Sequence, residues 1–115
     1  MSLNVEIQSL HLDVNLLQLS GQLNADTVIP LKAKLSATPS NSHWIIDLTG
    51  VRFMDSRGIT FLISMYKTCR SQGKQLFLSG IQKHPFEVLC LCSLDRVFQF
   101  VSNPGYALHL LRNAS

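Results

Sequence analysis

The run Trp44-Ile45-Ile46-Asp47-Leu48 is the feature that most constrains the fold of this chain. It has the length of one strand and is apolar almost throughout, without the strict alternation of apolar and polar residues typical of a half-exposed strand. Strands of this kind are common inside parallel sheets, where both faces are covered. The run therefore predicts an interior strand that is buried on both faces.

Strand and helix patterns alternate on either side of this run. Leu3, Val5 and Ile7 recur at period two and predict a first strand, and a second strand pattern begins at Leu12. Helical patterns follow at residues 28–35, 56–73, 84–91 and 104–111, and further strand patterns at residues 75–79 and 97–101. This alternation indicates an α/β fold, an open and mostly parallel sheet joined by crossover helices, with the first strand antiparallel at an edge.

Length, composition and charge limit the number of domains and the kinds of partner that we expect for this chain. The 115 residues fit a single domain, residues 1–115, and 46% hydrophobic against 15% charged residues is a globular composition. The net charge is +3 and the basic residues are scattered, so nucleic acid is not an expected partner. No apolar run approaches the roughly 20 residues that span a bilayer, and no signal peptide is recognisable. We expect a cytoplasmic protein without direct membrane insertion.

The cysteines and histidines do not predict a metal site. An odd number of cysteines, Cys69, Cys90 and Cys92, in a chain without a secretory signal predicts free thiols. Cys90 and Cys92 lie two residues apart on a predicted helix, so their side chains diverge by about 200°. The histidines are spread along the chain and form no ligand pair. We therefore expect neither a metal nor a cofactor.

Loops at the carboxyl ends of parallel strands are where such sheets usually carry function. Two loops qualify, Gly21–Asp26 and Thr49–Gly58, and the second leads from a predicted connection, Thr49–Asp55, into the longest helix. Ser56 starts that helix and is a candidate N-cap, while Gly58 leaves room for another molecule to approach the backbone. A phosphate on Ser56 would be tolerated at a helix N-terminus and would add a charge of about −1.5 to −2. A plain N-cap without further function is the alternative.

The helix that follows Ser56 predicts a partner surface. At about 100° per residue, one sector of it is apolar and should face the sheet. The residues of that sector are Ile59, Leu62, Ile63 and Tyr66. Phe61 and Met65 fall nearly opposite, one turn apart, and are predicted to be exposed and to contact a partner. The alternative is that a neighbouring helix or loop covers them.

The run Asp47–Ile59 resembles the signature of STAS domains, which are the bacterial anti-sigma factor antagonists and the related domains of sulfate transporters. Gly21-Gln22-Leu23-Asn24 is similar to the family's earlier Gly-x-Leu-Asp element, and Val88–Phe98 to its late helix-to-strand segment. The resemblance extends from about Leu3 to Leu111. It implies four or five strands, with about four helices packed mainly on one side of the sheet.

The resemblance also implies a partner-switching role. The unphosphorylated antagonist binds an anti-sigma factor that is also a serine kinase, the kinase phosphorylates the serine after the Asp, and a phosphatase resets the cycle. Ser56 matches that serine, and it is the expected phosphorylation site. The residues expected to bind the partner are Asn24, Asp55, Ser56, Arg57, Gly58, Phe61 and Met65.

This sequence departs from the family pattern at three positions. Asn24 replaces an acidic residue, Arg57 stands where a small hydroxyl residue is common, and Ser93 where glycine is frequent. Asn24 and Arg57 make the corner around Ser56 less negative, which bears on the choice of partner.

Two other functions stay open to comparison. A constitutive accessory or scaffold subunit, for example of a transporter ATPase complex, would use the same surface without a phosphate cycle. An enzyme is not expected, because neither Cys90 or Cys92 with His84 nor Ser56 with Asp55 has a base and an orienting group at a recognisable spacing. A weak homodimer also stays open, since the helix from His84 to about Leu91 could carry a self-association patch.

Overall fold

The computed structural model describes residues 2–11, 13–38 and 41–113. Leu12, where the second strand pattern was predicted to begin, lies outside the described residues. The elements in chain order are β1 (Leu3–His11), β2 (Val14–Leu23), α1 (Ala25–Ser36), β3 (His43–Met54), α2 (Ser56–Ser71), β4 (Leu76–Ser79), α3 (Lys83–Leu91), the 3₁₀ turn η1 (Leu94–Arg96), β5 (Gln99–Val101) and α4 (Pro104–Asn113).

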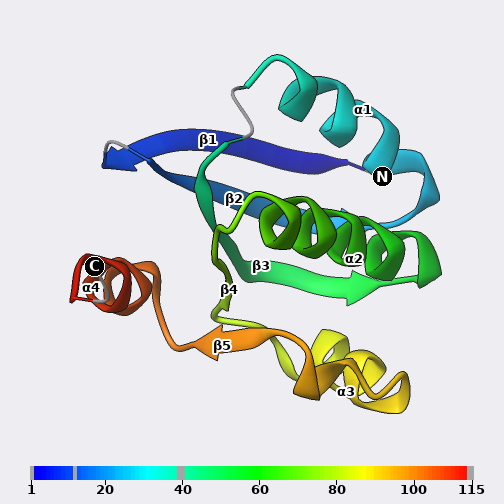
Figure 1. Cartoon of the computed structure of the whole chain (residues 1–115). Helices are drawn as coiled ribbons and strands as arrows, with labels where there is room; N and C mark the ends of the chain where they lie inside the picture. Colours follow the sequence, from blue (N-terminus) through cyan, green and yellow to red (C-terminus); the bar gives the residue numbers. More distant parts are fainter. Residues whose placement is uncertain (1, 12, 39–40, 114–115) are drawn as a thin grey trace.

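The strands form one open sheet in the order β1-β2-β3-β4-β5 (Figure 1). β1 pairs antiparallel with β2, and the remaining neighbours pair parallel. β3 lies in the middle of the sheet, and both Ile45 and Ile46, whose side chains point to opposite faces, are fully buried. The predictions of a mostly parallel α/β sheet and of an interior Trp44–Leu48 strand are confirmed.

The helices divide unequally between the faces of the sheet. α1, α2 and α3 contribute Leu31, Leu62 and Leu89 to the larger apolar core, which includes Ile46 and Leu78 of the central strands. Of the described helices, α4 packs on the other face, where it places Ala107 in a separate core cluster. The strand residues of that second cluster are Val14, Leu16, Ile45 and Phe77. The helices therefore pack mainly on one side, as the resemblance implied.

β3 is longer than the sequence predicted. The prediction that Thr49–Asp55 is a connection is wrong, because β3 continues to Met54 and pairs with the end of β2, with Leu23 beside Met54. β4 ends earlier, at Ser79, which pairs with Asp47. The last residues of β3 therefore project beyond β4 as a tip, and α3 packs against β3. This tip carries the chain directly into Ser56.

The two edges of the sheet differ in length. β5, at one edge, pairs over three residues only. β1, at the other edge, has nine residues, and the Lys34 ammonium of α1 donates a hydrogen bond of 2.8 Å to the Val5 carbonyl. A cationic side chain thus occupies part of the longer edge.

Candidate functional site

The starts of α1, α2 and α3 lie at the same end of the molecule as the carboxyl ends of β2 and β3 (Figure 1). We call this the Ser56 end and define it by residues 24–26, 52–58 and 82–84. The parallel strand directions and the crossover connections bring these segments together, because each helix begins where a strand ends. The Ser56 end contains most of the residues that the sequence singled out.

Asp55 organises the Ser56 end. One of its carboxylate oxygens accepts hydrogen bonds from the backbone N–H groups of Arg57 (2.9 Å) and Gly58 (3.2 Å), which makes Asp55 the N-cap of α2. The other oxygen accepts from the N–H of Ala25 at 3.3 Å. The prediction that Ser56 is the N-cap is therefore wrong, because the carboxylate of Asp55 already takes the free amides. The prediction that Ser56 lies at a helix N-terminus is confirmed.

Ser56 is the first residue of α2, and its side chain is exposed. Within the described part of the chain its hydroxyl makes no hydrogen bond, while its carbonyl accepts from the Thr60 hydroxyl at 2.9 Å. Among the described residues, no side chain therefore hydrogen-bonds to this hydroxyl, which is exposed at the surface.

Asn24 caps α1 rather than presenting its side chain to solvent. Its side-chain oxygen accepts from the N–H groups of Asp26 (3.0 Å) and Thr27 (3.1 Å), and the Thr27 hydroxyl accepts from the N–H of Asn24 at 2.9 Å. Asn24 is 8% exposed. An aspartate would cap equally well, so the amide performs the same structural role without a negative charge. Its contact with a partner stays a prediction.

Gly58 serves the packing of the chain itself. A side-chain Cβ at this position would lie 2.5 Å from the Met54 Cγ and 2.7 Å from the Leu23 carbonyl oxygen. The expectation that Gly58 leaves room for another molecule is wrong, because Met54 and Leu23 fill that space. Gly58 instead lets the first turn of α2 lie close to the ends of β2 and β3.

Phe61 is buried, with 2% of its surface exposed, so the prediction that it lies on an outer face is wrong. The buried side of α2 is centred on Gly58, Leu62 and Cys69 rather than on the predicted sector. Phe61 lies on one flank of that side, and α1 packs against α2. Met65 is only partly buried, so a contact between Met65 and a partner stays a prediction.

An aromatic pair at the Ser56 end does not follow from the sequence pattern. Phe53, at the tip of β3, is 43% exposed, and its ring stacks on that of His84 with centroids 5.7 Å apart. Arg52, Arg57 and Lys83 are exposed on the same segments. Phe53 was overlooked because Thr49–Asp55 was treated as an irregular connection, in which a single phenylalanine carries little information.

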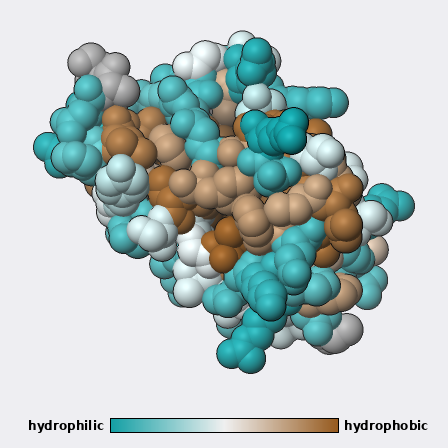
Figure 2. All heavy atoms as spheres, turned by 90° about the horizontal axis from the view of Figure 1, so that it is seen from below, coloured by the Kyte–Doolittle hydropathy of each residue, from teal (hydrophilic) through white to brown (hydrophobic). Residues whose placement is uncertain are grey.

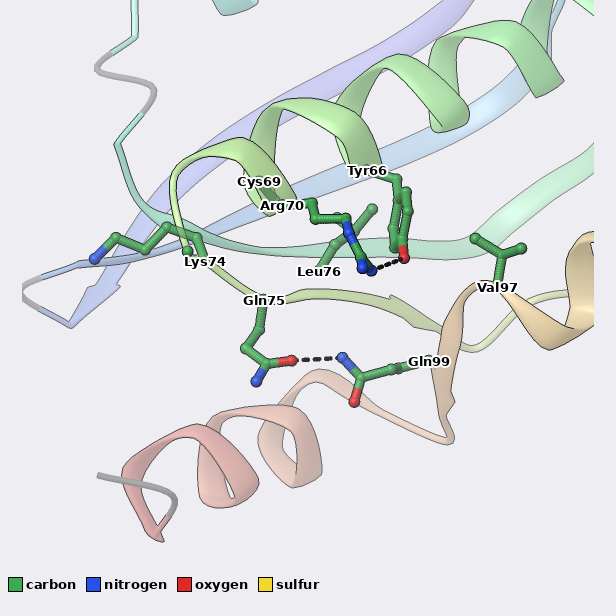
Figure 3. Close-up of a pocket in the computed structure, with 9 residues that line it drawn as sticks. Tyr66, Cys69, Arg70, Lys74, Gln75, Leu76, Val97 and Gln99 are labelled. Carbon is green, nitrogen blue, oxygen red and sulfur yellow. Dashed lines mark hydrogen bonds between the residues drawn. The ribbon is translucent and has the colours of Figure 1, made fainter.

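A cavity of about 430 Å³ lies at the other end of α2 (Figure 3). Two hydrogen bonds join residues that line it. The Arg70 guanidinium donates to the Tyr66 hydroxyl (2.9 Å), and the Gln99 side-chain amide donates to the side-chain oxygen of Gln75 (2.6 Å). Burial raises the pKa of the Cys69 thiol in its wall to about 11, so the thiol is protonated at neutral pH and is no nucleophile. The cavity shares no residue with the Ser56 end.

The face seen from below carries a band of apolar side chains bordered by polar ones (Figure 2). On α3 and just before β5, Phe86, Leu91 and Val97 are exposed by 37%, 87% and 38%. The expected weak homodimer stays a prediction.

Among the residues described, no helix is long and apolar enough to cross a membrane, and no group of three or more acidic, histidine or cysteine side chains is placed to hold a metal.

Comparison with known proteins places this geometry in a family. Residues 8–102 match the family described as "Mlab, STAS domain". An anti-sigma-B factor antagonist of Listeria monocytogenes is 24% identical over 107 residues, which cover 91% of this chain and 94% of the relative. The names of such relatives describe regulatory antagonists rather than enzymes, in agreement with the prediction of no catalytic activity.

Solved structures agree with the fold. A crystal structure described as a putative anti-sigma factor antagonist from Thermotoga maritima superimposes with a TM-score of 0.85 at 20% identity, covering 94% of each chain. A Bacillus cell fate determinant, solved in its phosphorylated form, superimposes with a TM-score of 0.74 at 15% identity, covering 94% of this chain and 99% of the other. At these identities the likeness concerns the fold.

Proposed function

This chain belongs to the STAS domain family, and on that premise we propose that it is a regulatory binding protein whose attachment to an anti-sigma factor is switched by phosphorylation of Ser56. The observation that carries the proposal is the Ser56 hydroxyl, which is exposed at the start of α2 and makes no hydrogen bond in the described part of the chain. A partner kinase supplies the phosphoryl group and a phosphatase removes it. The chain supplies only the hydroxyl and the surface around it, in a bacterial cytoplasm.

The geometry supports a switch that acts at the interface and not through the fold. Asp55 already accepts from the N–H groups of Arg57 and Gly58, so a phosphate on Ser56 would lie outside the cap and project toward solvent. It would add a charge of about −1.5 to −2 at the surface that the partner contacts. A loss of about 2–3 kcal/mol in binding weakens affinity about 30- to 150-fold, which is enough to exchange partners.

The test compares Ser56→Asp and Ser56→Ala in binding to the anti-sigma factor kinase co-expressed with the chain. We expect Ser56→Asp to bind poorly while keeping a native circular-dichroism spectrum, and Ser56→Ala to bind but to resist release by the kinase. Ser9→Asp, an exposed position on β1 at the opposite end, is the matched control for the added charge. Intact mass after co-expression should show one phosphate on the wild-type chain and none on Ser56→Ala.

Equal binding by the Ala and Asp variants would contradict the proposal. A constitutive accessory or scaffold subunit, such as one that docks on a transporter ATPase, would then be the better description. Such a subunit would copurify with its partner whatever the state of Ser56.

A further inference from the structure

We propose that the stacked pair Phe53 and His84, together with Arg52, Arg57 and Lys83, forms a contact surface for an acidic partner protein. The inference rests on the proposed function, since the partner is the anti-sigma factor, and it names the chemistry by which that partner is recognised. We call these five residues the aromatic-basic surface.

The aromatic pair is held in place before any partner arrives. The two rings are nearly parallel, with an interplanar angle of 15°. Phe53 belongs to strand β3, where it pairs with Gln22 of β2, and His84 belongs to the first turn of α3. The Gln82 amide donates a hydrogen bond of 2.6 Å to the Thr49 carbonyl and so fastens the start of α3 to β3. An exposed aromatic side chain that is already ordered is the kind of anchor that dominates binding energy at protein interfaces.

The cations of the Ser56 end form no ion pair among the described residues. Between residues 2–11, 13–38 and 41–113 the charged pair is that of Lys74 and Asp13 at the other end of the molecule, and the His43 ring lies 3.5 Å from the same carboxylate. Arg52, Arg57 and Lys83 therefore stand exposed without an ion pair. A partner that covers them must supply carboxylates, because burying unpaired cations costs free energy.

The carboxylates of the Ser56 end, Asp26 and Asp55, offset two of the three positive charges but form no ion pair with these cations among the described residues. Both oxygens of Asp55 accept backbone N–H groups, and Asp26 lies in the first turn of α1, where it offsets the helix dipole. Glu87, one turn after Lys83 on α3, is exposed and forms no ion pair with it among the described residues. The start of α3 also lacks a side-chain cap, which leaves its first N–H groups to an acceptor from outside.

Through this surface, a phosphate on Ser56 would weaken the electrostatic attraction to an acidic partner. The cations Arg52, Arg57 and Lys83 and the carboxylates Asp26 and Asp55 give the Ser56 end a formal charge of +1, and a phosphate of about −1.5 to −2 would change it to about −0.5 to −1. Attraction to an acidic partner falls accordingly, without any change of fold. The same charges should make binding sensitive to ionic strength, since exposed charges are screened over about 8–10 Å at physiological salt.

The experiment measures binding of the co-expressed anti-sigma factor kinase to Phe53→Ala, Arg52→Glu and Lys83→Glu. We expect Phe53→Ala to weaken binding about tenfold or more, and each charge reversal to weaken it and to reduce its salt dependence. Tyr106→Ala is the matched aromatic control, because Tyr106 is 51% exposed and stacks on His109 of α4. Lys67→Glu, exposed late in α2, is the matched charge control. Both controls should bind within about twofold of the wild type, as expected for residues outside an interface.

The outcomes separate this inference from the phosphorylation switch. If Ser56→Asp releases the kinase while the three surface variants bind like the controls, the aromatic-basic surface is wrong and the switch stands. If the surface variants weaken binding and Ser56→Asp does not, the surface stands and the switch fails. Failure of the wild-type chain to bind the kinase overturns both. Phe53-dependent binding of a single-stranded oligonucleotide in place of the kinase overturns the surface as a protein contact.

Discussion

Asp55 does at the Ser56 end what a serine was expected to do. Its carboxylate accepts backbone N–H groups from the first turn of α2 and from Ala25, and its own N–H donates to the Leu23 carbonyl at 3.1 Å. The two loops are therefore joined through one residue. Because these bonds bypass Ser56, its hydroxyl can be esterified without breaking any of them.

This division of roles predicts different stabilities for two alanine variants. Asp55→Ala should lower the free energy of unfolding by about 1–2 kcal/mol, the range for a lost helix cap. Ser56→Ala should change it by less than about 0.5 kcal/mol, as is usual for exposed sites without a structural role. Urea unfolding followed by circular dichroism measures both, with Asp55→Asn as the variant that keeps an acceptor. An equal loss for Ser56→Ala would contradict the assignment of the cap.

His43 makes the stability of the domain depend on pH. Burial lowers the pKa of its imidazole below the ordinary 6.5, more than the nearby Asp13 carboxylate raises it. The neutral ring also accepts a hydrogen bond of 2.8 Å from the Gln75 N–H at Nδ1, which protonation would break. The unfolded chain, whose histidine keeps its ordinary pKa, therefore binds the proton first as the pH falls. The contribution of His43 is full above pH 6.5 and is lost progressively toward its lower pKa in the folded state.

The measurement is the melting temperature at about pH 7.5 and about pH 5, on either side of an ordinary histidine pKa. The wild type should lose more thermal stability on acidification than His43→Gln, which cannot titrate but keeps an acceptor. The same loss in both proteins would assign the pH dependence to other groups.

Two residues show where prediction from the sequence failed at this scale. Gly58 and Phe61 are both determined by packing with distant segments: Leu23 on β2 lies against Gly58, and Phe61 is buried in the core that the strands and α1 share. A helical wheel shows which residues share a side, but it does not show which side is covered by which neighbour. Ser56 was placed correctly because a helix start is encoded locally.

At the scale of elements, β3 illustrates the same limit. Its apolar half was predicted because continuous apolar residues are a local signal. Its second half was not, because the strand there is held by pairing with β2 through two shifts of register, between Gln18 and Ser20 and between Gly21 and Gln22. A Cβ at Gly50 would lie 2.8 Å from the Ser20 hydroxyl, so the close approach of the two strands depends on a residue that otherwise indicates a turn.

Just after α3, Ser93 has a backbone conformation that favours glycine. Ser93 follows the helix with a φ of 59°, in the left-handed region, and its N–H donates to the Cys90 carbonyl at 2.9 Å. A residue with a Cβ is strained there, whereas glycine is not. The conformation is therefore one for the glycine that the resemblance to STAS domains implied at this position.

Ser93→Gly should therefore raise the free energy of unfolding by about 0.5–1 kcal/mol, the relief of strain less the added freedom of the unfolded chain. Ser93→Ala, which keeps the Cβ, should bring no gain. Urea unfolding of the two variants side by side decides the matter. A glycine variant that is less stable than the wild type would show that the serine side chain contributes more than its conformation costs.

At the scale of the whole molecule, the three cysteines differ in burial, so their reactivity measures how readily different parts of the fold open. Cys69 is buried, and burial raises the pKa of its thiol to about 11, whereas Cys90 and Cys92 are exposed. Desolvation, with Asp95 and Glu87 nearby, also raises the pKa of Cys90. A thiol-reactive reagent should label two cysteines of the native protein and the third only after global unfolding, since the thiolate is the reactive form.

Peptide mass mapping identifies the labelled positions, and Cys69→Ser provides the control for the slow phase. Rapid labelling of Cys69 under native conditions would mean that α2 opens from the sheet far more often than its packing implies. The relative labelling rates of Cys90 and Cys92 are a further check. The raised pKa of Cys90 predicts that its thiol reacts more slowly than an ordinary surface thiol.

The ammonium of Lys34 on the Val5 carbonyl has a consequence for how this molecule behaves when it is abundant. β1 leaves nine residues of backbone at the rim of the sheet, a template on which a further strand from another copy can grow toward fibrils. A strand that docks there must displace the ammonium of Lys34 and break its hydrogen bond to the Val5 carbonyl. The domain thus carries its own protection against polymerisation at the one rim long enough to need it.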